Sequence, residues 1–166
     1  QKKDIFELRY ADTYYRFVNT VARRLGERWP GKYVAFLPYA AVQEPPEFKL
    51  EDNVIMFIFS YRGNPKQIYD KWAGKVNHVG VYQWLYGSCH VIPNHWPHAI
   101  QDYLQWLRER GGNAFKGEAY VPWAQGGLKM WVLSNLLWDA DADVDALIQD
   151  YLVHCYGKEA APAMAD

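Results

Sequence analysis

The sequence predicts an α/β fold of the (β/α)8 TIM-barrel type, of which this chain holds about the C-terminal four βα units plus a terminal helix. Short apolar segments alternate with helical segments of about ten to fifteen residues, a length that suits right-handed crossovers. The apolar segments do not alternate with polar residues, as expected for parallel strands covered on both faces. A complete barrel usually needs about 250 residues. We therefore expect residues 1–166 to be a single domain, half of a barrel and part of a longer protein; a small open sheet is the alternative.

The first predicted element is a helix over roughly residues 12–28. Asp12 is its expected N-cap, and Phe17, Val18, Val21 and Leu25 recur at helical spacing as its buried stripe. A short run of β-branched and aromatic residues at 33–37 then predicts the first strand, and a Pro-rich loop follows it.

The remaining elements follow in the same alternating order. Residues 54–59 predict the second strand, and Pro65 suits the first turn of a helix whose apolar positions are Ile68, Tyr69, Trp72 and Val76. Residues 79–85 predict the third strand. A helix from Pro97 ends at Gly111 and Gly112, because glycine commonly closes helices. A strand from Ala114 reaches Glu118, and residues 144–156 predict the last helix.

Charge and hydropathy exclude two classes of partner. The net charge of −1 is spread without basic blocks, so we expect no nucleic acid partner. No run approaches the roughly twenty apolar residues of a membrane helix, so we expect no membrane span. Cys89 and Cys155 do not form a metal motif; a buried free thiol is the simple reading, and a bridge between them is disfavoured.

Aromatic residues make up 17% of the chain, with eight Trp and thirteen Tyr. Some are expected to pack from helices onto the sheet: Phe17, Trp72, Trp106 and Trp131. Others fall in the segments that follow the strands: Tyr39, Tyr61, Trp84, Tyr86, Trp96, Tyr120 and Trp123. Rings at such positions either stack on the apolar faces of sugars or pack a long loop, and the sequence leaves both open.

Glu118 is the most informative acidic residue, because it ends a predicted strand and precedes two aromatic residues. Ligands of β/α barrels bind at the C-terminal ends of the strands. A partly desolvated carboxylate there can donate a proton, act as nucleophile or accept hydrogen bonds from sugar hydroxyls. Its structural alternative is a salt bridge beneath a loop. Glycoside hydrolysis ordinarily needs a second carboxyl group or a substrate acetamido group, and we expect a second acid, if there is one, upstream of Gln1.

Other polar residues divide between binding and structural roles. Asp139, Asp141, Asp143 and Asp145 resemble the start of a calcium loop, but its later positions do not match, and helix capping is the better reading. His98 lies just inside a helix and is expected to be structural. His90 is kept as a ligand contact, and Arg62 either binds substrate or forms a salt bridge. We expect no metal site and no cofactor.

Several runs resemble a large bacterial family of domains of unknown function, similar to and partly overlapping glycoside hydrolase family 163. The runs are YQWLYGS at 82–88, IP at 92–93, PH at 97–98, GEAYVPW at 117–123, LLWDADADVD at 136–145, YRFVN at 15–19 and KYV at 32–34. The resemblance covers nearly the whole chain. It implies an endo-β-N-acetylglucosaminidase-like barrel acting on glycans, export from the cell, and the N-terminal half of the same barrel as partner.

Positions at or after the strand ends give the candidate site residues. Glu118 is the candidate catalytic residue, and a substrate ligand is its close alternative. The candidate substrate-binding residues are Tyr39, Tyr61, Arg62, Gln83, Tyr86, His90, Tyr120 and Trp123. A carbohydrate-binding or sensing barrel without catalysis is the alternative function, and an independent half-barrel is a third possibility.

Overall fold

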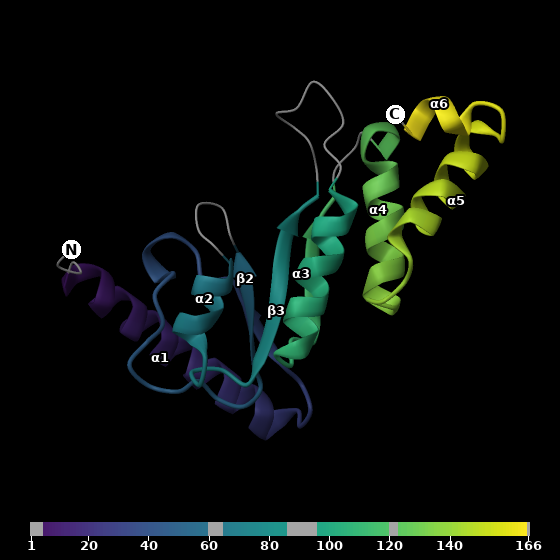
Figure 1. Cartoon of the computed structure of the whole chain (residues 1–166). Helices are drawn as coiled ribbons and strands as arrows, with labels where there is room; N and C mark the ends of the chain where they lie inside the picture. Colours follow the sequence, from purple (N-terminus) through teal and green to yellow (C-terminus); the bar gives the residue numbers. More distant parts are fainter. Residues whose placement is uncertain (1–4, 60–64, 86–95, 120–122, 166) are drawn as a thin grey trace. The chain divides into compact units, whose positions relative to one another are not determined.

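The computed structural model describes residues 5–59, 65–85, 96–119 and 123–165, with the side chains of 5–9 and 123–125 outside this description (Figure 1). The chain forms two compact units. Unit 1 comprises residues 1–83 and 111–117, and unit 2 comprises residues 84–110 and 118–166. The expectation of a single domain over residues 1–166 stays a prediction.

Unit 1 is built on a curled, four-stranded parallel sheet in the order β1-β2-β3-β4, as in half of an α/β barrel. Its strands are β1 (Val34–Phe36), β2 (Val54–Phe59), β3 (His78–Trp84) and β4 (Ala114–Glu118). These strands lie within one or two residues of the predicted segments, and β2 matches its prediction. The predicted α/β class and the half-barrel arrangement are therefore confirmed.

The two faces of the sheet differ in burial. On the face covered by helices, Val54, Met56 and Ile58 of β2 are at most 1% exposed. On the opposite face, here called the second face, Ile55 and Phe57 are half-buried. The register pairs Ile55 with His78, Phe57 with Gly80 and Phe59 with Tyr82. Alternation along parallel strands therefore places these six residues together on the second face.

Helix α1 (Ile5–Arg28) begins earlier than predicted. Asp12 lies inside the helix rather than at its N-cap, and its carboxylate accepts the backbone N–H of Glu47. The predicted buried stripe is also partly wrong, because Phe17 and Val21 are exposed although Val18 is buried. The buried positions are Ala11, Tyr15, Val18 and Ala22.

An aromatic cluster joins α1 to the sheet and to α2 (Pro65–Trp72). The Tyr15 ring lies edge-on to Phe36 of β1 and to Trp72 of α2, with centroids 5.2 and 5.1 Å apart. The Tyr15 hydroxyl donates to the carbonyl of Val42, and Trp72 Nε1 donates to the carbonyl of Gln43. Burial raises the pKa of the Tyr15 hydroxyl above its ordinary range, so it remains protonated. The cluster fixes the 3-10 turn η1 (Ala40–Val42) that follows β1.

Unit 2 contains four helices among its described residues: α3 (Pro97–Glu109), α4 (Trp123–Trp138), α5 (Val144–Tyr156) and α6 (Ala161–Ala165). Helix α3 begins at Pro97 as predicted. The capping prediction for Asp143 is confirmed, because its carboxylate accepts the N–H of Ala146 at the start of α5. His98 Nε2 lies 3.0 Å from Asp145 Oδ1, which links α3 to α5 and supports its structural role.

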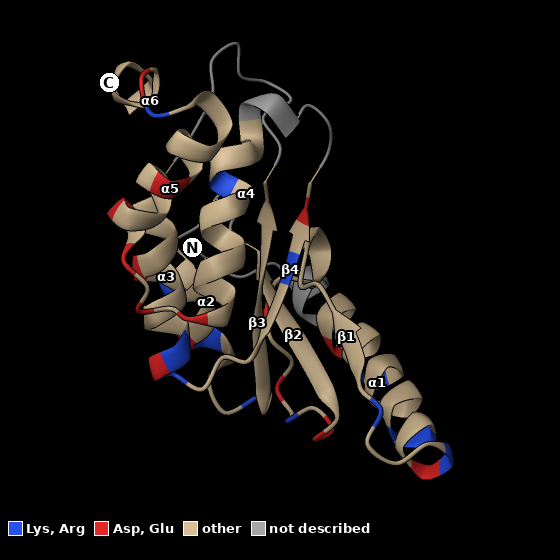
Figure 2. Ribbon diagram, turned by 90° about the vertical axis from the view of Figure 1, so that its right-hand side faces the viewer, with Lys and Arg blue, Asp and Glu red and all other residues tan. Residues whose placement is uncertain are grey.

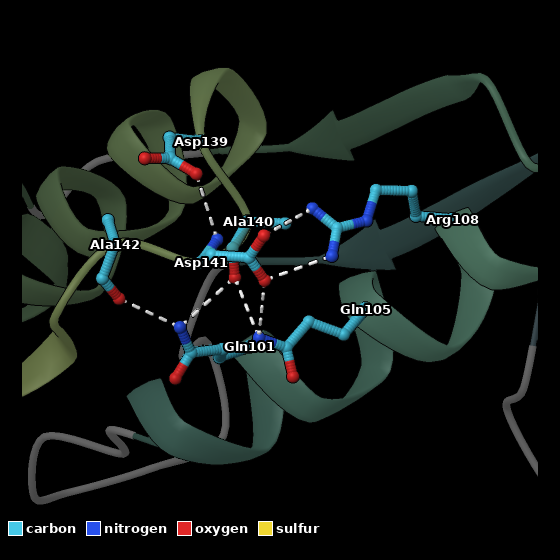
Figure 3. Close-up of polar contacts among 7 residues, drawn as sticks. All are labelled: Gln101, Gln105, Arg108, Asp139, Ala140, Asp141 and Ala142. Carbon is cyan, nitrogen blue, oxygen red and sulfur yellow. Dashed lines mark hydrogen bonds and ion pairs between the residues drawn. The ribbon is translucent and has the colours of Figure 1, made fainter.

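A polar cluster attaches α3 to the turn between α4 and α5 (Figure 3). Arg108 donates two hydrogen bonds of 2.9 Å to the Asp141 carboxylate. Gln105 Nε2 donates to Asp141 Oδ1 and to the carbonyl of Ala140, and Gln101 also bonds this turn. Asp139 accepts the N–H of Asp141. The acidic run therefore shapes a turn and caps a helix.

Some aromatic and cysteine predictions are corrected. Trp72 is buried as expected, whereas Trp131 is 39% exposed and donates Nε1 to the carbonyl of Leu147. Trp106 is half-buried and stacks on Tyr103 of the same helix. Cys155 is a free thiol but exposed rather than buried, and Cys89 lies outside the described residues. None of the helices in the described ranges has both the length and the apolar character that a membrane crossing requires.

Replacing Gly80 with alanine is expected to destabilise the protein by about 1–3 kcal/mol. A Cβ on Gly80 would lie 2.7 Å from Phe57 Cε1 and 2.8 Å from the carbonyl oxygen of Ala114, so β2, β3 and β4 would have to separate. Chemical denaturation measures the change. Gly126→Ala in α4 is the control, because no described heavy atom lies within 4 Å of its Cβ position; it should gain up to about 1 kcal/mol. Equal stabilities of Gly80→Ala and the wild type would contradict the close packing.

The Arg108–Asp141 pair is expected to make stability depend on acidic pH. The hydrogen bonds from Arg108 lower the pKa of the Asp141 carboxyl below its ordinary value. The stabilisation is therefore complete above the unfolded pKa of about 3.9 and is lost as pH falls through the lower folded pKa. Urea unfolding of wild type and Asp141→Asn between pH 6 and pH 2 tests this. The wild-type advantage should shrink below about pH 4 and with added salt, since both side chains are exposed. An advantage that persists unchanged at low pH would refute it.

Candidate functional site

The predicted site residues lie at or beyond the C-terminal ends of the strands, and the structure describes three of them with their side chains: Tyr39, Gln83 and Glu118. Five lie outside the described residues: Tyr61, Arg62, Tyr86, His90 and Tyr120. Trp123 is the first residue of α4, and its side chain also lies outside the description. The binding roles of these six residues stay predictions.

A row of side chains crosses the sheet near the C-terminal ends of the strands, all within unit 1. The Tyr39 ring, three residues beyond β1, lies 5.3 Å from the Phe59 ring at the end of β2. Phe59 in turn lies edge-on to Tyr82 of β3, also at 5.3 Å. Lys116 of β4 places its Nζ 5.6 Å from the centre of the Tyr82 ring. We call these four residues the ring row.

The ring row follows from the strand register and from alternation. Phe59 and Tyr82 are register partners on the second face. Gly80, two residues before Tyr82, has no side chain there, and Phe57 Cε1 occupies the space that a Cβ would need. Packing therefore presses the aromatic side chains of β2 against β3 along this face. An edge-to-face contact such as that between Phe59 and Tyr82 contributes about 0.5–1.5 kcal/mol of stability beyond the burial of the rings.

The members of the ring row differ in accessibility. Phe59 and Tyr82 are 6% and 5% exposed, whereas Tyr39 is 48% exposed. Phe59 and Tyr82 are therefore buried parts of the core. Tyr39 packs against Phe59 and exposes part of its own ring to solvent. An exposed aromatic ring held in one orientation suits stacking on the apolar face of a sugar, because little conformational entropy is lost on binding.

Charge in the sheet is confined to β4, as the blue and red segments of that strand show in Figure 2. Lys116 is exposed and Glu118 is half-buried. Alternation places both on the same face of β4. The carbonyl of Glu118 accepts the N–H of Leu85 at 2.8 Å, so the backbone that carries this carboxylate is anchored beside the end of β3. The predicted strand-end position of Glu118 is confirmed, and its catalytic role stays a prediction.

The side chain of Gln83 points to the face of the sheet opposite to the ring row. It follows Tyr82 directly in β3, so alternation turns its side chain to the helix-covered face, the face of Val79 and Val81. Gln83 is half-buried at the end of the strand. The ring row therefore does not include it, and its binding role also stays a prediction.

Another acid, Glu44 in the loop after β1, was not singled out from the sequence. The Nζ atom of Lys71 in α2 lies 2.6 Å from the Glu44 carboxylate and forms an ion pair with it. The neighbouring carbonyl of Gln43 accepts from Trp72 of α2. This loop is therefore tied to the helix layer, and the ion pair gives Glu44 a structural role.

Lys129 is a buried cation that the sequence reading also missed. It is 4% exposed, the one charged residue of α4, and its Nζ lies 5.4 Å from the centre of the Trp96 ring. Burial lowers its pKa. The available signal was a single lysine in an otherwise uncharged helix. In the described parts of the chain, no group of three or more His, Cys, Asp or Glu residues is placed to hold a metal ion.

A family model described as a domain of unknown function (DUF4838) matches residues 2–166. No curated protein and no solved structure matches the chain significantly.

Two members of the ring row, Phe59 and Tyr39, should respond differently to truncation. Phe59→Ala removes a buried ring between two others and is expected to cost about 3–5 kcal/mol of unfolding free energy. Tyr39→Ala removes a half-exposed ring and should cost about 1 kcal/mol. Chemical denaturation of both variants measures the difference. Similar losses for the two would show that Tyr39 is a core residue and not a presented ring.

Proposed function

The chain belongs to the DUF4838 family of domains of unknown function, and within this family we propose that it is part of a glycan-binding β/α barrel. In this proposal the barrel has eight strands, and the N-terminal half of the same barrel supplies the other four. The sugar binds at the C-terminal ends of the strands. The substrates are glycans that contain β-linked N-acetylglucosamine, and the protein is exported to meet them.

The observation that carries this proposal is the ring row. A half-exposed Tyr39 packs against the buried Phe59 ring, which in turn packs against the buried Tyr82 ring. These rings lie near the strand ends, which is where barrels of this type bind ligands. Lys116, on the same face, adds a hydrogen-bond donor for sugar hydroxyls or a carboxylate. Aromatic stacking combined with a few polar groups is a general means of binding sugars, because it matches their apolar faces and their hydroxyl edges.

The reaction we propose is hydrolysis of the glycosidic bond, in the manner of an endo-β-N-acetylglucosaminidase. Support comes from the position of Glu118 at the end of β4 and from the resemblance of the GEAYVPW run to the family that overlaps glycoside hydrolase family 163. A single carboxylate suffices when the acetamido group of the substrate acts as nucleophile. Glu118 then donates the proton to the leaving oxygen or, if the acid pair lies upstream, binds sugar hydroxyls.

The second candidate function is carbohydrate binding without catalysis. The ring row favours it as strongly as it favours hydrolysis, because stacking on Tyr39 requires no acid. The two functions differ in turnover. A wild-type protein that binds a β-linked N-acetylglucosamine oligosaccharide but releases no product over hours would support the binding function and exclude hydrolysis of that sugar.

Glu118→Gln separates the possible roles of this carboxylate in the polypeptide that carries this segment. If Glu118 transfers the proton, kcat on a β-linked N-acetylglucosamine oligosaccharide should fall about 10²–10⁴-fold, while affinity measured by calorimetry stays within about twofold. A loss of affinity with turnover preserved would make Glu118 a sugar ligand. No change in either would contradict a functional role. Glu27→Gln, at an exposed position of α1, is the matched control and should change neither quantity.

A further inference from the structure

Lys116 lies on the second face of the sheet, at the β4 end of the ring row. A Cβ on Gly80 would lie 2.8 Å from the Cβ of Ala114, so the Ala114 side chain points to the second face. Alternation along β4 then places Lys116 on this face as well. Its Nζ lies 5.6 Å from the centre of the Tyr82 ring, within the range of a cation–π contact. The ammonium of Lys116 is therefore held at one end of the ring row, and the Tyr39 ring is at the other end.

The positive charge of Lys116 is not balanced by an acid in the described part of the chain. Lys116 is exposed, and no ion pair joins it to a described acidic residue. This includes Glu118, which follows two residues later on the same face of β4. By contrast, Arg23 of α1 and Lys71 of α2 both pair with carboxylates. The exposed ammonium of Lys116 is therefore available to an anionic group of a ligand.

The other three strands carry no charge that opposes Lys116. β1, β2 and β3 contain no Lys, Arg, Asp or Glu. Their one histidine, His78, is at the opposite end of β3, where its Nδ1 lies 3.2 Å from Asn113 Nδ2. The buried rings of Phe59 and Tyr82 also restrict water on one side of the ring row. An ion pair formed with Lys116 is therefore stronger than the same pair in bulk water.

The spacing within the ring row suits an oligosaccharide. The centre of the Phe59 ring lies 5.3 Å from those of Tyr39 and Tyr82. The Lys116 Nζ lies 5.6 Å from the centre of the Tyr82 ring. Each step is close to the length of one pyranose residue in a β-linked chain, and Tyr39 and Lys116 are at most three such steps apart. A short glycan that stacks on Tyr39 can therefore reach Lys116 with another of its residues.

We infer that the glycan of the proposed function is acidic, and that its carboxylate or sulfate group binds the ammonium of Lys116. The inference rests on the proposed glycan-binding site and names the substrate class of that site. In this arrangement one sugar ring stacks on Tyr39, and a residue further along the glycan carries the anionic group. Lys116 thus discriminates between acidic and neutral glycans of the same length, because a charged acceptor gains more from an ammonium than a hydroxyl does.

Two matched pairs of oligosaccharides test the inference by titration calorimetry with the natural polypeptide. The first pair is a β-linked chain in which N-acetylglucosamine alternates with glucuronic acid, together with its carboxyl-reduced form. The second pair is a β-linked N-acetylglucosamine oligosaccharide with and without 6-O-sulfate. We expect an acidic form to bind about three- to tenfold more tightly than its neutral partner at low salt. This preference should shrink as salt is added.

Two substitutions of Lys116 assign the preference to its ammonium. In Lys116→Gln the acidic and neutral forms should bind within about twofold of each other, and in Lys116→Glu the neutral form should bind more tightly. Lys32→Gln is the matched control, because Lys32 is exposed and lies two residues before β1, at the N-terminal ends of the strands. It removes the same charge and should keep the wild-type preference. Circular dichroism verifies that each variant is folded.

A preference for the acidic form in either pair supports the inference; one confined to the first pair identifies a carboxylate, and one confined to the second a sulfate. Equal binding of acidic and neutral forms by the wild type would overturn the inference and leave the glycan-binding proposal intact. A preference that persists unchanged in Lys116→Gln would also overturn it, because another group would then bind the anion. If none of the oligosaccharides binds, the proposed function fails and the inference fails with it.

Discussion

The packing of Tyr15 against Phe36 and Trp72 is the contact on which the arrangement of unit 1 depends. It joins two helices and a strand at one point, and the Tyr15 hydroxyl and the Trp72 indole also hold the loop after β1. Tyr39 belongs to that loop and directly precedes η1. The packing of Tyr15 against Phe36 and Trp72 therefore also determines where the Tyr39 ring lies against Phe59. The position of the proposed sugar-stacking residue is thus set from the opposite face of the sheet, by residues that are buried there.

The two faces of the sheet carry different kinds of side chain. The helix-covered face is filled by apolar side chains such as Val54 and Met56, and their burial contributes hydrophobic stabilisation. The second face carries rings toward the strand ends and becomes more accessible at Tyr39. The half-exposed Tyr39, which the proposed function uses for stacking, is not one of the residues that hold the sheet to its helices.

The sequence predicted those features that depend on local signals. β2 was located from its uninterrupted apolar run, and the start of α3 from its initial proline. The cap at Asp143 was located in the same way, from residues close to it in sequence. The buried face of α1 was not predicted correctly, because two apolar stripes lie side by side on this helix. The choice between Tyr15 and Phe17 as the buried residue depends on which one contacts Phe36 in the fold. The ring row needs the register of β2 on β3, which the sequence does not state. Lys129 was missed because burial of a lone lysine depends on neighbours distant in sequence.

The order of the strands in the sheet follows their order in the chain. β2, β3 and β4 each lie beside the strand synthesised before them, so none of these three waits for a distant partner. The cluster of Tyr15, Phe36 and Trp72 is complete once residue 72 is available. Unit 1 can therefore begin to fold while the ribosome is still translating the helices of unit 2. Vectorial folding of this kind limits the time during which apolar strands are exposed in the nascent chain.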